Sequence, residues 1–384
     1  MRFQVPTKIF FGPGTIAQLE DIVKNELRAE KPFCITDKGI RGSGIAGKVT
    51  SPFPDMPVFD EIEQNPKHPT VDRAGRLVRD FKPDLIIGLG GGSAMDAAKA
   101  TALLATNPGS IEEYEGRAKY MAPPLPVLAV PTTCGTASEV TWVAVVTHTE
   151  RKFKMSIKGP LMFPAAALVD PDLLKTLPPS LVASTGMDAL THAIEAYTVK
   201  PATHITDIFA RASLKYVFQS IEEAYNDIQG NAKARERIML GSMLAGFAFG
   251  NSDVGAVHCI AEAVGSLYDT PHGVANAIFL PFVMEFNLPV AARRFAEISR
   301  LAGIHEVDDY EAAQLLIQKI KNLSQKLNIP SAKDIGLEES HFLEIAQKSF
   351  ANNSNPSNPR EARIEDYIQI LLRTIGDVPS GTTL

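Results

Sequence analysis

Four side chains in this sequence have the types and the spacing of one divalent-metal site. Asp188 and His192 lie one helical turn apart in the segment GMDALTHAIEAY, so both project from the same face of a helix. His258 and His272 follow, fourteen positions apart, and a straight helix would hold them roughly 21 Å from each other. The turn signal YDTP at 268–271 breaks that helix and lets His272 fold back. Three imidazoles and one carboxylate suit Zn2+ or Fe2+ and suit Ca2+ or Mg2+ poorly.

These four residues also admit a plainer interpretation. An Asp-x-x-x-His pair on a helix is usually a surface or capping feature, and His258 and His272 lie among small apolar residues, where a histidine can be a hydrogen-bonded core residue. The other five of the eight histidines show no similar grouping in the sequence: His68, His148, His204, His305 and His341. The metal interpretation is favoured because the same chain carries a second set of residues that suits a nucleotide.

The second set is a glycine-rich loop, GLGGGS at 88–93. It follows an apolar strand expected at 85–88 and opens a helix expected at 94–105, with Ser93 as the expected N-cap. Backbone N–H groups at such a helix N-terminus can bind a pyrophosphate. Serine stands where the GxGxxG dinucleotide fingerprint has its last glycine, so a tight turn without a ligand is the alternative.

Two further segments carry groups that a nicotinamide cofactor could use. Asp37 ends a strand expected at 33–36, and its carboxylate could accept hydrogen bonds from an adenosine ribose. The same carboxylate would repel a 2′-phosphate, which favours NAD over NADP. The loop PTTCGTASEVT at 131–141 is dense in hydroxyls that can bond phosphates or an amide. A solvated turn aspartate and a hydroxyl-rich loop without a ligand are the ordinary alternatives.

The order of the expected elements places these groups in two domains. Strands alternate with helices in the first part of the chain, where a Thr15/Gln18 capping box would begin a helix at 16–27. Beyond it only helices are expected, including 205–228, 232–250, 289–302, 310–327 and 364–375. We therefore predict an α/β, Rossmann-like dinucleotide-binding domain over 1–175 and an all-α helical domain over 176–384, with the active site in the cleft between them.

The composition of the chain limits the classes of function that it can have. The 384 residues carry 38 Lys and Arg against 44 Asp and Glu, a net charge of −6, which does not favour a nucleic-acid partner. The three cysteines are far apart and lack CxxC spacing, which indicates a reducing cytosol. We see no signal-peptide pattern and no run of eighteen apolar residues, so we expect a cytoplasmic protein with no membrane partner.

The motifs together resemble those of the iron-containing (group III, metal-dependent) alcohol dehydrogenase family along essentially the whole chain: PTKIFFGPGT, GGGSAMDAAKA, PTTCGTASEVT, TGMDALTHAIEAY and TPHGVANAIFLP. The resemblance implies reversible hydride transfer between NAD(H) and a small alcohol or aldehyde, by a homodimer or a larger homo-oligomer. It implies that Asp188, His192, His258 and His272 hold Fe2+ or Zn2+ between the domains. It assigns the cofactor to eleven residues: Asp37, Asn65, Gly90, Gly91, Gly92, Ser93, Asp96, Thr132, Thr133, Thr136 and Lys154.

One position departs from the family's pattern. Many members have a second histidine four residues after the third ligand, near the substrate, where this chain has Glu262. Glu262 could relay a proton, approach the metal as a further ligand, stay a neutral buried acid or bond a neighbouring helix. The sequence leaves these roles open.

Other functions and the choice of substrate also stay open. A glycerol-dehydrogenase-like or dehydroquinate-synthase-like enzyme of the same fold would be expected to show a different ligand pattern. A non-catalytic nucleotide-binding protein would be expected to lack a ligand. Candidate substrates run from short alcohols and diols to hydroxy acids and sulfonated or phosphonated aldehydes. An anionic substrate would need a cation in the pocket, and the candidates are Arg151, Lys154, Lys158 and Arg360.

Overall fold

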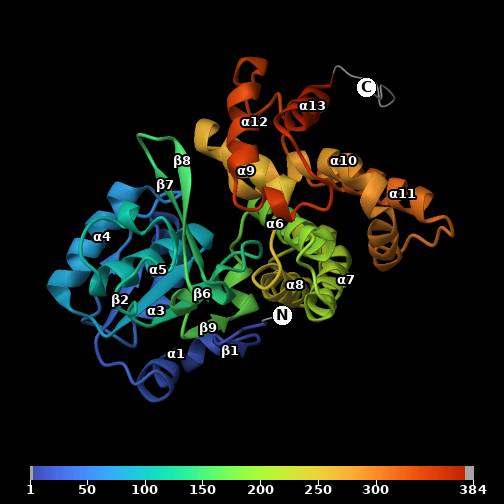
Figure 1. The fold of residues 1–384 in the computed structure, drawn as a ribbon. Coiled ribbons are helices and arrows are strands. Elements are labelled where there is room, and N and C mark those ends of the chain that lie inside the picture. The colour runs from blue at the N-terminus through green and yellow to red at the C-terminus, as the bar shows by residue number, and fades with distance from the viewer. Residues whose placement is uncertain (1–2, 377–384) are drawn as a thin grey trace.

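A six-stranded parallel sheet forms the core of the N-terminal half (Figure 1). The computed structural model describes residues 3–376. Across the sheet the strands follow the order β1 (Lys8–Phe11), β9 (Ala166–Val169), β6 (Val127–Pro131), β4 (Leu85–Gly90), β2 (Pro32–Ile35) and β3 (Val58–Phe59). Parallel strands end at one edge, so the loops after β2, β4 and β6 meet there. These loops carry Asp37, the glycines and the hydroxyls.

Helices cover both faces of this sheet, as apolar parallel strands require. The alternation along β4 separates two cores: Ile86 packs with α4 (His68–Phe81) and α5 (Gly92–Thr106), while Leu85, Ile87 and Leu89 pack with α3 (Ile45–Thr50). Two shorter helices complete the covering layers, α1 (Leu19–Asp21) and α2 (Lys38–Gly42). The α/β fold class is therefore confirmed for this half.

A second, three-stranded sheet contains β5 (Gly116–Arg117), β8 (Phe153–Lys158) and β7 (Val143–His148), in that order. β7 and β8 form an antiparallel hairpin, the β7–β8 hairpin, whose residues alternate between two faces. One face joins the core beside α5, through Ala144, Val146, Met155 and Ile157. The sequence analysis did not predict β8, because two lysines and a serine occupy alternate positions of this strand and give it the polar pattern of a loop.

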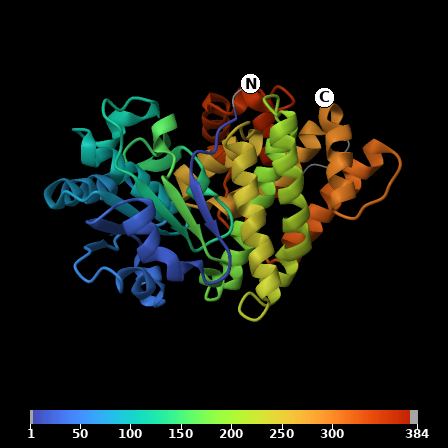
Figure 2. The same cartoon turned by 90° about the horizontal axis from the view of Figure 1, so that it is seen from below.

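No strand follows β9 in the described part of the chain. The helices are α6 (Pro179–Thr198), α7 (His204–Asn226), α8 (Ala232–Phe249), α9 (Ala256–Tyr268), α10 (His272–Leu301), α11 (Asp309–Lys326), α12 (Phe342–Ala351) and α13 (Ile364–Ile375). Figure 2 shows α7 and α8 side by side next to the sheet. Among the described helices, α10 alone is long and apolar enough to cross a membrane, and 72% of its most apolar 18-residue window is buried in the protein.

The helix predicted at 16–27 is broken. A 3-10 turn at Thr15–Gln18, α1 and one turn of π-helix replace it. No capping box forms, because the Thr15 hydroxyl donates to the preceding turn. Two N–H groups at the start of this segment donate instead to the carboxylate of Asp170. A partner from a distant part of the chain thus replaces the expected local cap.

Two other helix starts differ from the prediction. α5 begins at Gly92 with Gly91 as its N-cap, so Ser93 lies inside the first turn and is not the cap. The helix predicted at 289–302 is the second half of α10, which continues through Pro289 because packing against α6 and α11 holds it together. The domain boundary predicted near residue 175 lies between β9 and α6 and stays a prediction.

Candidate active site

Three helices bring the four predicted metal ligands together. Asp188 and His192 lie on α6, His258 lies on α9, and His272 is the first residue of α10. One ligand atom from each residue lies within 4.8 Å of the others. Asp188 Oδ1 is 3.7 Å from both His192 Nδ1 and His272 Nε2. α9 ends at the YDTP turn, where Asp269 takes the left-handed conformation (φ 52°), so the predicted fold-back of the chain is present.

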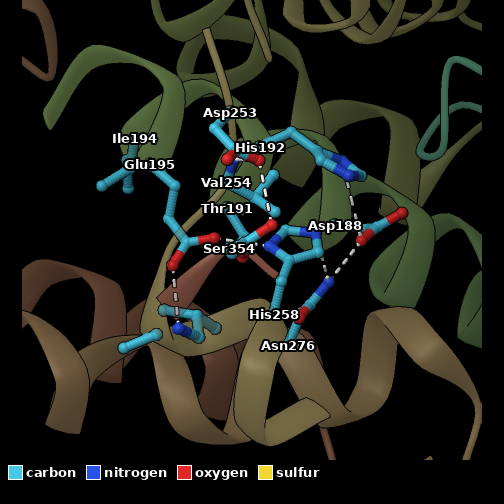
Figure 3. Close-up of polar contacts among 12 residues, drawn as sticks. Asp188, Thr191, His192, Ile194, Glu195, Asp253, Val254, His258, Asn276 and Ser354 are labelled. Carbon is cyan, nitrogen blue, oxygen red and sulfur yellow. Dashed lines mark hydrogen bonds and ion pairs between the residues drawn. The ribbon is translucent and has the colours of Figure 1, made fainter. Parts of the chain in front are cut away.

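Glu195 of α6 sets the orientation and the tautomer of His258 (Figure 3). Glu195 Oε2 lies 2.5 Å from His258 Nδ1, and Glu195 Oε1 accepts a hydrogen bond from the Val257 N–H at 2.8 Å. A carboxylate oxygen accepts hydrogen bonds, so the His258 Nδ1–H donates to Glu195, and Nε2 is the ring nitrogen left to face the cluster. Burial lowers the pKa of His258, but the charge and hydrogen bond of Glu195 together with the charges of Asp188 and Glu262 outweigh burial and raise this pKa above its usual value.

The cluster has the donor chemistry that a transition metal requires. Burial lowers the pKa of His192 to about 3, so this ring is neutral at physiological pH. Burial, Lys154 and His258 likewise lower the pKa of His272. Within residues 3–376, the buried Nδ1 of His192 has no hydrogen-bond partner. A buried nitrogen left in this way is costly and a metal ion would satisfy it, so the four residues fit Zn2+ or Fe2+.

The sequence analysis missed Asn276 on α10. Its side-chain amide nitrogen is 2.7 Å from Asp188 Oδ1 and 3.2 Å from Nε2 of both His258 and His272. The three ligand atoms therefore converge on one small region. Figure 3 shows the Asn276 amide beside two of these residues, Asp188 and His258. Asn276 follows His272 by four residues on the same helix face, so helical spacing could have indicated it.

We predict that Glu195→Gln weakens metal binding without unfolding the protein. Glutamine retains an oxygen for the Val257 N–H but removes the charge that holds the proton on His258 Nδ1. Loss of such a partner lowers metal affinity roughly 10–100-fold. A chelator competition titration measures this change. Glu285→Gln is the matched control, because Glu285 pairs with Lys321 away from the cluster and its replacement is expected to leave metal affinity unchanged. An affinity equal to wild type in Glu195→Gln would reduce Glu195 to a packing role.

A cleft of about 820 Å³, which we call the nucleotide cleft, runs along the carboxyl edge of the sheet. Eight of the eleven predicted cofactor residues line it: Asp37, Asn65, Gly91, Gly92, Ser93, Thr132, Thr133 and Thr136. Asp37 is also the N-cap of α2, where its Oδ1 accepts from the Ile40 N–H at 2.9 Å. Gly90 ends β4 with a φ of 142°, a conformation that favours glycine, and does not line the cleft.

The start of α5 suits an anionic group. Its N-cap Gly91 has no side-chain cap, so the first N–H groups of the helix stay free toward the nucleotide cleft. A Cβ on Gly92 would lie 2.6 Å from Thr136 Cγ2, so only glycine lets the hydroxyl loop approach this closely. The buried hydroxyl of Thr132 has no hydrogen-bond partner in the described residues. These features fit a nucleotide phosphate.

A second cavity of about 400 Å³, the inner cavity, adjoins the nucleotide cleft. Five residues line both spaces: Asn65, Gly92, Ser93, Thr136 and His272. His192 and His258 also line the inner cavity, as do three other residues that the sequence analysis singled out, Asp96, Lys154 and Glu262. The two spaces therefore meet at the ligand cluster.

These three residues have different surroundings. Lys154 is buried and donates to Asn65 Oδ1 at 2.9 Å; burial lowers its pKa, against the charges of Glu262 and Asp269. Asp96 accepts from the Ser138 hydroxyl (2.5 Å) and the Val145 N–H (2.9 Å), which ties α5 to the hydroxyl loop and to the β7–β8 hairpin. Glu262 Oε2 accepts from the Asn352 amide at 2.7 Å. The cofactor roles of Lys154 and Asp96 and the role of Glu262 stay predictions.

Two histidines that showed no grouping in the sequence meet in the structure. The rings of His68 and His148 are 4.5 Å apart and lie close to Glu150. Both rings are already hydrogen-bonded: each Nδ1 lies 3.3 Å from a backbone N–H, and His148 Nε2 lies 2.9 Å from Glu112. We assign this pair a structural role, because its ring nitrogens are occupied by protein partners.

A parallel sheet, a cleft along its carboxyl edge and a neighbouring cluster of one carboxylate and three imidazoles are together the arrangement expected of an enzyme that uses a nucleotide and a metal ion. The sequence matches the family described as iron-containing alcohol dehydrogenase over residues 6–171, and the C-terminal part of the Fe-containing alcohol dehydrogenase family over residues 182–375. The chain belongs to the iron-containing alcohol dehydrogenase family, whose activity is the oxidoreduction of alcohols and aldehydes with NAD(H) and a divalent metal.

Individual relatives agree with this membership. The chain is 37% identical to 1,3-propanediol dehydrogenase of Citrobacter freundii over 377 residues, which is 96% of this chain and 97% of that protein. It is 33% identical to NAD-dependent methanol dehydrogenase of Bacillus methanolicus, over 96% of this chain and 98% of that protein. The crystal structure of a 1,3-propanediol oxidoreductase superposes with a TM-score of 0.93 at 36% identity, covering 97% of this chain and 99% of that one.

Proposed function

We propose that this protein catalyses reversible hydride transfer between NAD(H) and a small alcohol or aldehyde, with a divalent metal held by Asp188, His192, His258 and His272. The observation that carries the proposal is that the nucleotide cleft and the inner cavity share lining residues. One of these shared residues is the predicted metal ligand His272. A dinucleotide in the cleft and a substrate beside the ligand cluster would share one connected space. An ion in this cluster would supply Lewis-acid polarisation of the substrate oxygen, which brings the pKa of an alcohol toward neutrality.

The protein's own groups would hold the ligands and exclude water. Glu195 fixes His258, and the Phe249 ring stacks on His192 with ring centroids 4.1 Å apart. Phe249 and Val145 give the inner cavity an apolar side, which keeps water from a hydride-transfer reaction. Glu262 follows His258 by one helical turn and lines the same cavity. We assign Glu262 the transfer of the alcohol proton, in place of the histidine that many family members have there.

NADH is the proposed cofactor rather than NADPH. Asp37 lines the nucleotide cleft at the end of β2, where a carboxylate would repel a 2′-phosphate. The methanol dehydrogenase relative that its name describes as NAD-dependent supports the same choice.

The proposed function is tested with metal-stripped protein reconstituted separately with Fe2+, Zn2+ and no metal. Oxidation of NADH and of NADPH is followed with butanal and propanal. We expect turnover only with metal, and faster turnover with NADH than with NADPH because of Asp37. Equal turnover with and without metal would contradict the proposed role of the cluster. NADH binding without turnover in any metal form would favour the alternative of a non-catalytic nucleotide-binding protein.

Three further properties complete the proposal. A homodimer is favoured because β1 is an edge strand of the sheet, paired with β9 on one side, and an open edge can pair with a second chain. A reducing, cytoplasmic location is supported by three buried free thiols, Cys34, Cys134 and Cys259. A division into two domains near residue 175 agrees with the gap between the two family matches, which end at 171 and begin at 182.

A further inference from the structure

Asn65 lines both the nucleotide cleft and the inner cavity. It lies in the loop between β3 and α4, is 7% exposed and takes the left-handed backbone conformation (φ 52°). The backbone beside it is tied to β7, because the Thr147 N–H donates to the Pro66 carbonyl at 2.7 Å. The side-chain amide of Asn65 is therefore held at the place where the two spaces meet.

Two charged residues from different parts of the fold determine which way the Asn65 amide faces. Its Nδ2 donates to Asp269 Oδ1 at 2.8 Å, and its Oδ1 accepts from Lys154 Nζ on β8 at 2.9 Å. A carboxylate oxygen accepts hydrogen bonds, so the NH2 group faces Asp269 and the amide oxygen faces Lys154. One N–H and one lone pair of the amide then remain for a ligand.

Asp269 reaches Asn65 from the helical part of the chain. It is the C-cap of α9, in the turn three residues before His272, and it also takes the left-handed conformation (φ 52°). Its Oδ1 accepts a second hydrogen bond from Lys67 Nζ at 2.9 Å. Burial raises the pKa of Asp269, but the hydrogen bonds from Asn65 and Lys67 and the charges of Lys67 and Lys154 outweigh burial and lower this pKa below its usual value.

Asp269 can act on a ligand only through another residue. Its side chain is 65% exposed, and it is not among the described residues that line either space. The ion pair with Lys67 lies largely in water and contributes little by itself. The bond to Asn65 matters more, because Asp269 is the one partner of the buried Asn65 NH2 group in the described part of the chain.

We propose that Asp269 is a positioning residue for the cofactor. It holds the Asn65 amide in the orientation that presents one N–H and one oxygen lone pair to the hydroxyl groups of NADH, which can accept the first and donate to the second. This inference rests on the proposed function, because it requires NADH beside Asn65. Asp269 touches neither cofactor nor substrate and takes no part in hydride transfer.

A double-mutant cycle on the metal-loaded enzyme tests this role. Asp269→Gly and Asn65→Gly each remove a side chain without straining the backbone, because glycine favours the left-handed conformation of both positions. Isothermal titration calorimetry measures the Kd for NADH, and kinetics with butanal measure its KM and kcat. We expect Asp269→Gly to raise Kd and KM roughly fivefold, about the contribution of one hydrogen bond, and to leave kcat close to wild type.

The cycle separates an effect through Asn65 from a direct one. In the Asn65→Gly background, Asp269→Gly is expected to raise the Kd for NADH no further, because two residues that act as a unit are not additive. Chelator competition is expected to give Asp269→Gly the Zn2+ affinity of wild type. That result would show that the turn before His272 keeps its structure.

A conservative variant and a matched control complete the test. Asp269→Asn keeps an oxygen that accepts from Asn65 and tolerates the left-handed conformation, so its Kd for NADH is expected within about twofold of wild type. Asn328→Gly is the control, because Asn328 is exposed, also has a φ of 52° and donates to the Tyr225 hydroxyl away from both spaces. Its Kd for NADH is expected to equal that of wild type.

The failures of the two proposals are distinguishable. An unchanged Kd for NADH in Asp269→Gly would overturn this inference, and so would additive effects of the two glycine variants. A loss of Zn2+ affinity in Asp269→Gly would also overturn it, since Asp269 would then act on the turn before His272. The proposed function stands in each of these cases if the wild-type enzyme turns over butanal. NADH binding with the expected cycle but no turnover would overturn the proposed function alone, and no NADH binding to wild type would overturn both.

Discussion

Replacing Asp188 with Asn, or His272 with Ala, is expected to strip the metal and to lower kcat/KM for aldehyde reduction roughly a thousandfold or more. Lewis-acid polarisation contributes several kcal/mol to such a reaction, and about 1.4 kcal/mol corresponds to a factor of ten. Asp188→Asn is nearly isosteric, and its oxygen can still accept from Asn276, so the fold is expected to survive. Metal content by mass spectrometry and steady-state kinetics measure the two effects.

A surface histidine provides the control for this pair. His305→Ala removes an exposed imidazole outside the cluster, so metal content and kcat/KM are expected to equal those of wild type. Cofactor binding separates loss of metal from loss of fold, because the nucleotide cleft is lined mainly by the N-terminal half. If Asp188→Asn and His272→Ala kept both the metal and the activity, the four residues would not be a metal site.

Gly273→Ala is expected to destabilise the protein by about 3 kcal/mol and to weaken metal binding at the same time. A Cβ at Gly273 would lie 2.2 Å from the backbone oxygen of Ser184 and 3.2 Å from Asp188 Cβ, so α10 would have to move away from α6. Overpacking of this kind typically costs about 1–3 kcal/mol, and a rigid helix backbone leaves little room to relax. The same movement would separate His272 from Asp188. Denaturant unfolding and metal titration measure both changes.

Gly47→Ala is the matched control for this substitution. Gly47 lies in α3, is exposed, and a Cβ there would have no neighbour within 4 Å. Alanine is the better helix former, so the variant is expected to be as stable as wild type or more stable by up to about 1 kcal/mol. A Gly273→Ala protein with unchanged stability and unchanged metal affinity would show that the close approach of α10 to α6 does not set the ligand geometry.

Much of the candidate site could be predicted because its signals are local. Helix periodicity alone places Asp188 and His192 on one helix face. The YDTP sequence, directly before His272, predicts the end of the preceding helix. The glycine-rich loop follows an apolar strand and opens a helix, and β4 and α5 are both present. The α/β and helical fold class and the family membership were confirmed. They could be predicted because each long motif contains its strand, loop and helix signals in consecutive residues.

The predictions that were wrong concerned competition between local and distant partners. The predicted capping box at Thr15 does not form, because the carboxylate of Asp170, more than 150 positions away, accepts the N–H groups at this helix start. The strand β8 was not predicted because its alternating Lys and Ser side chains face a cavity rather than solvent, and only the folded chain creates that cavity.

The sequence by itself determined which atoms are available: one carboxylate and three imidazoles at helical spacing, glycines where a strand meets a helix, and an acid at Glu262. Only the tertiary structure decided which of these atoms face the cluster and how their pKa values change. His258 offers Nε2 to the cluster because Glu195, 63 positions earlier, holds its other nitrogen in a buried contact. The pKa of His192 is lowered because packing removes it from water. Residue types and short spacings are properties of neighbouring residues, whereas desolvation, tautomer and cavity charge depend on segments that meet only when the chain folds.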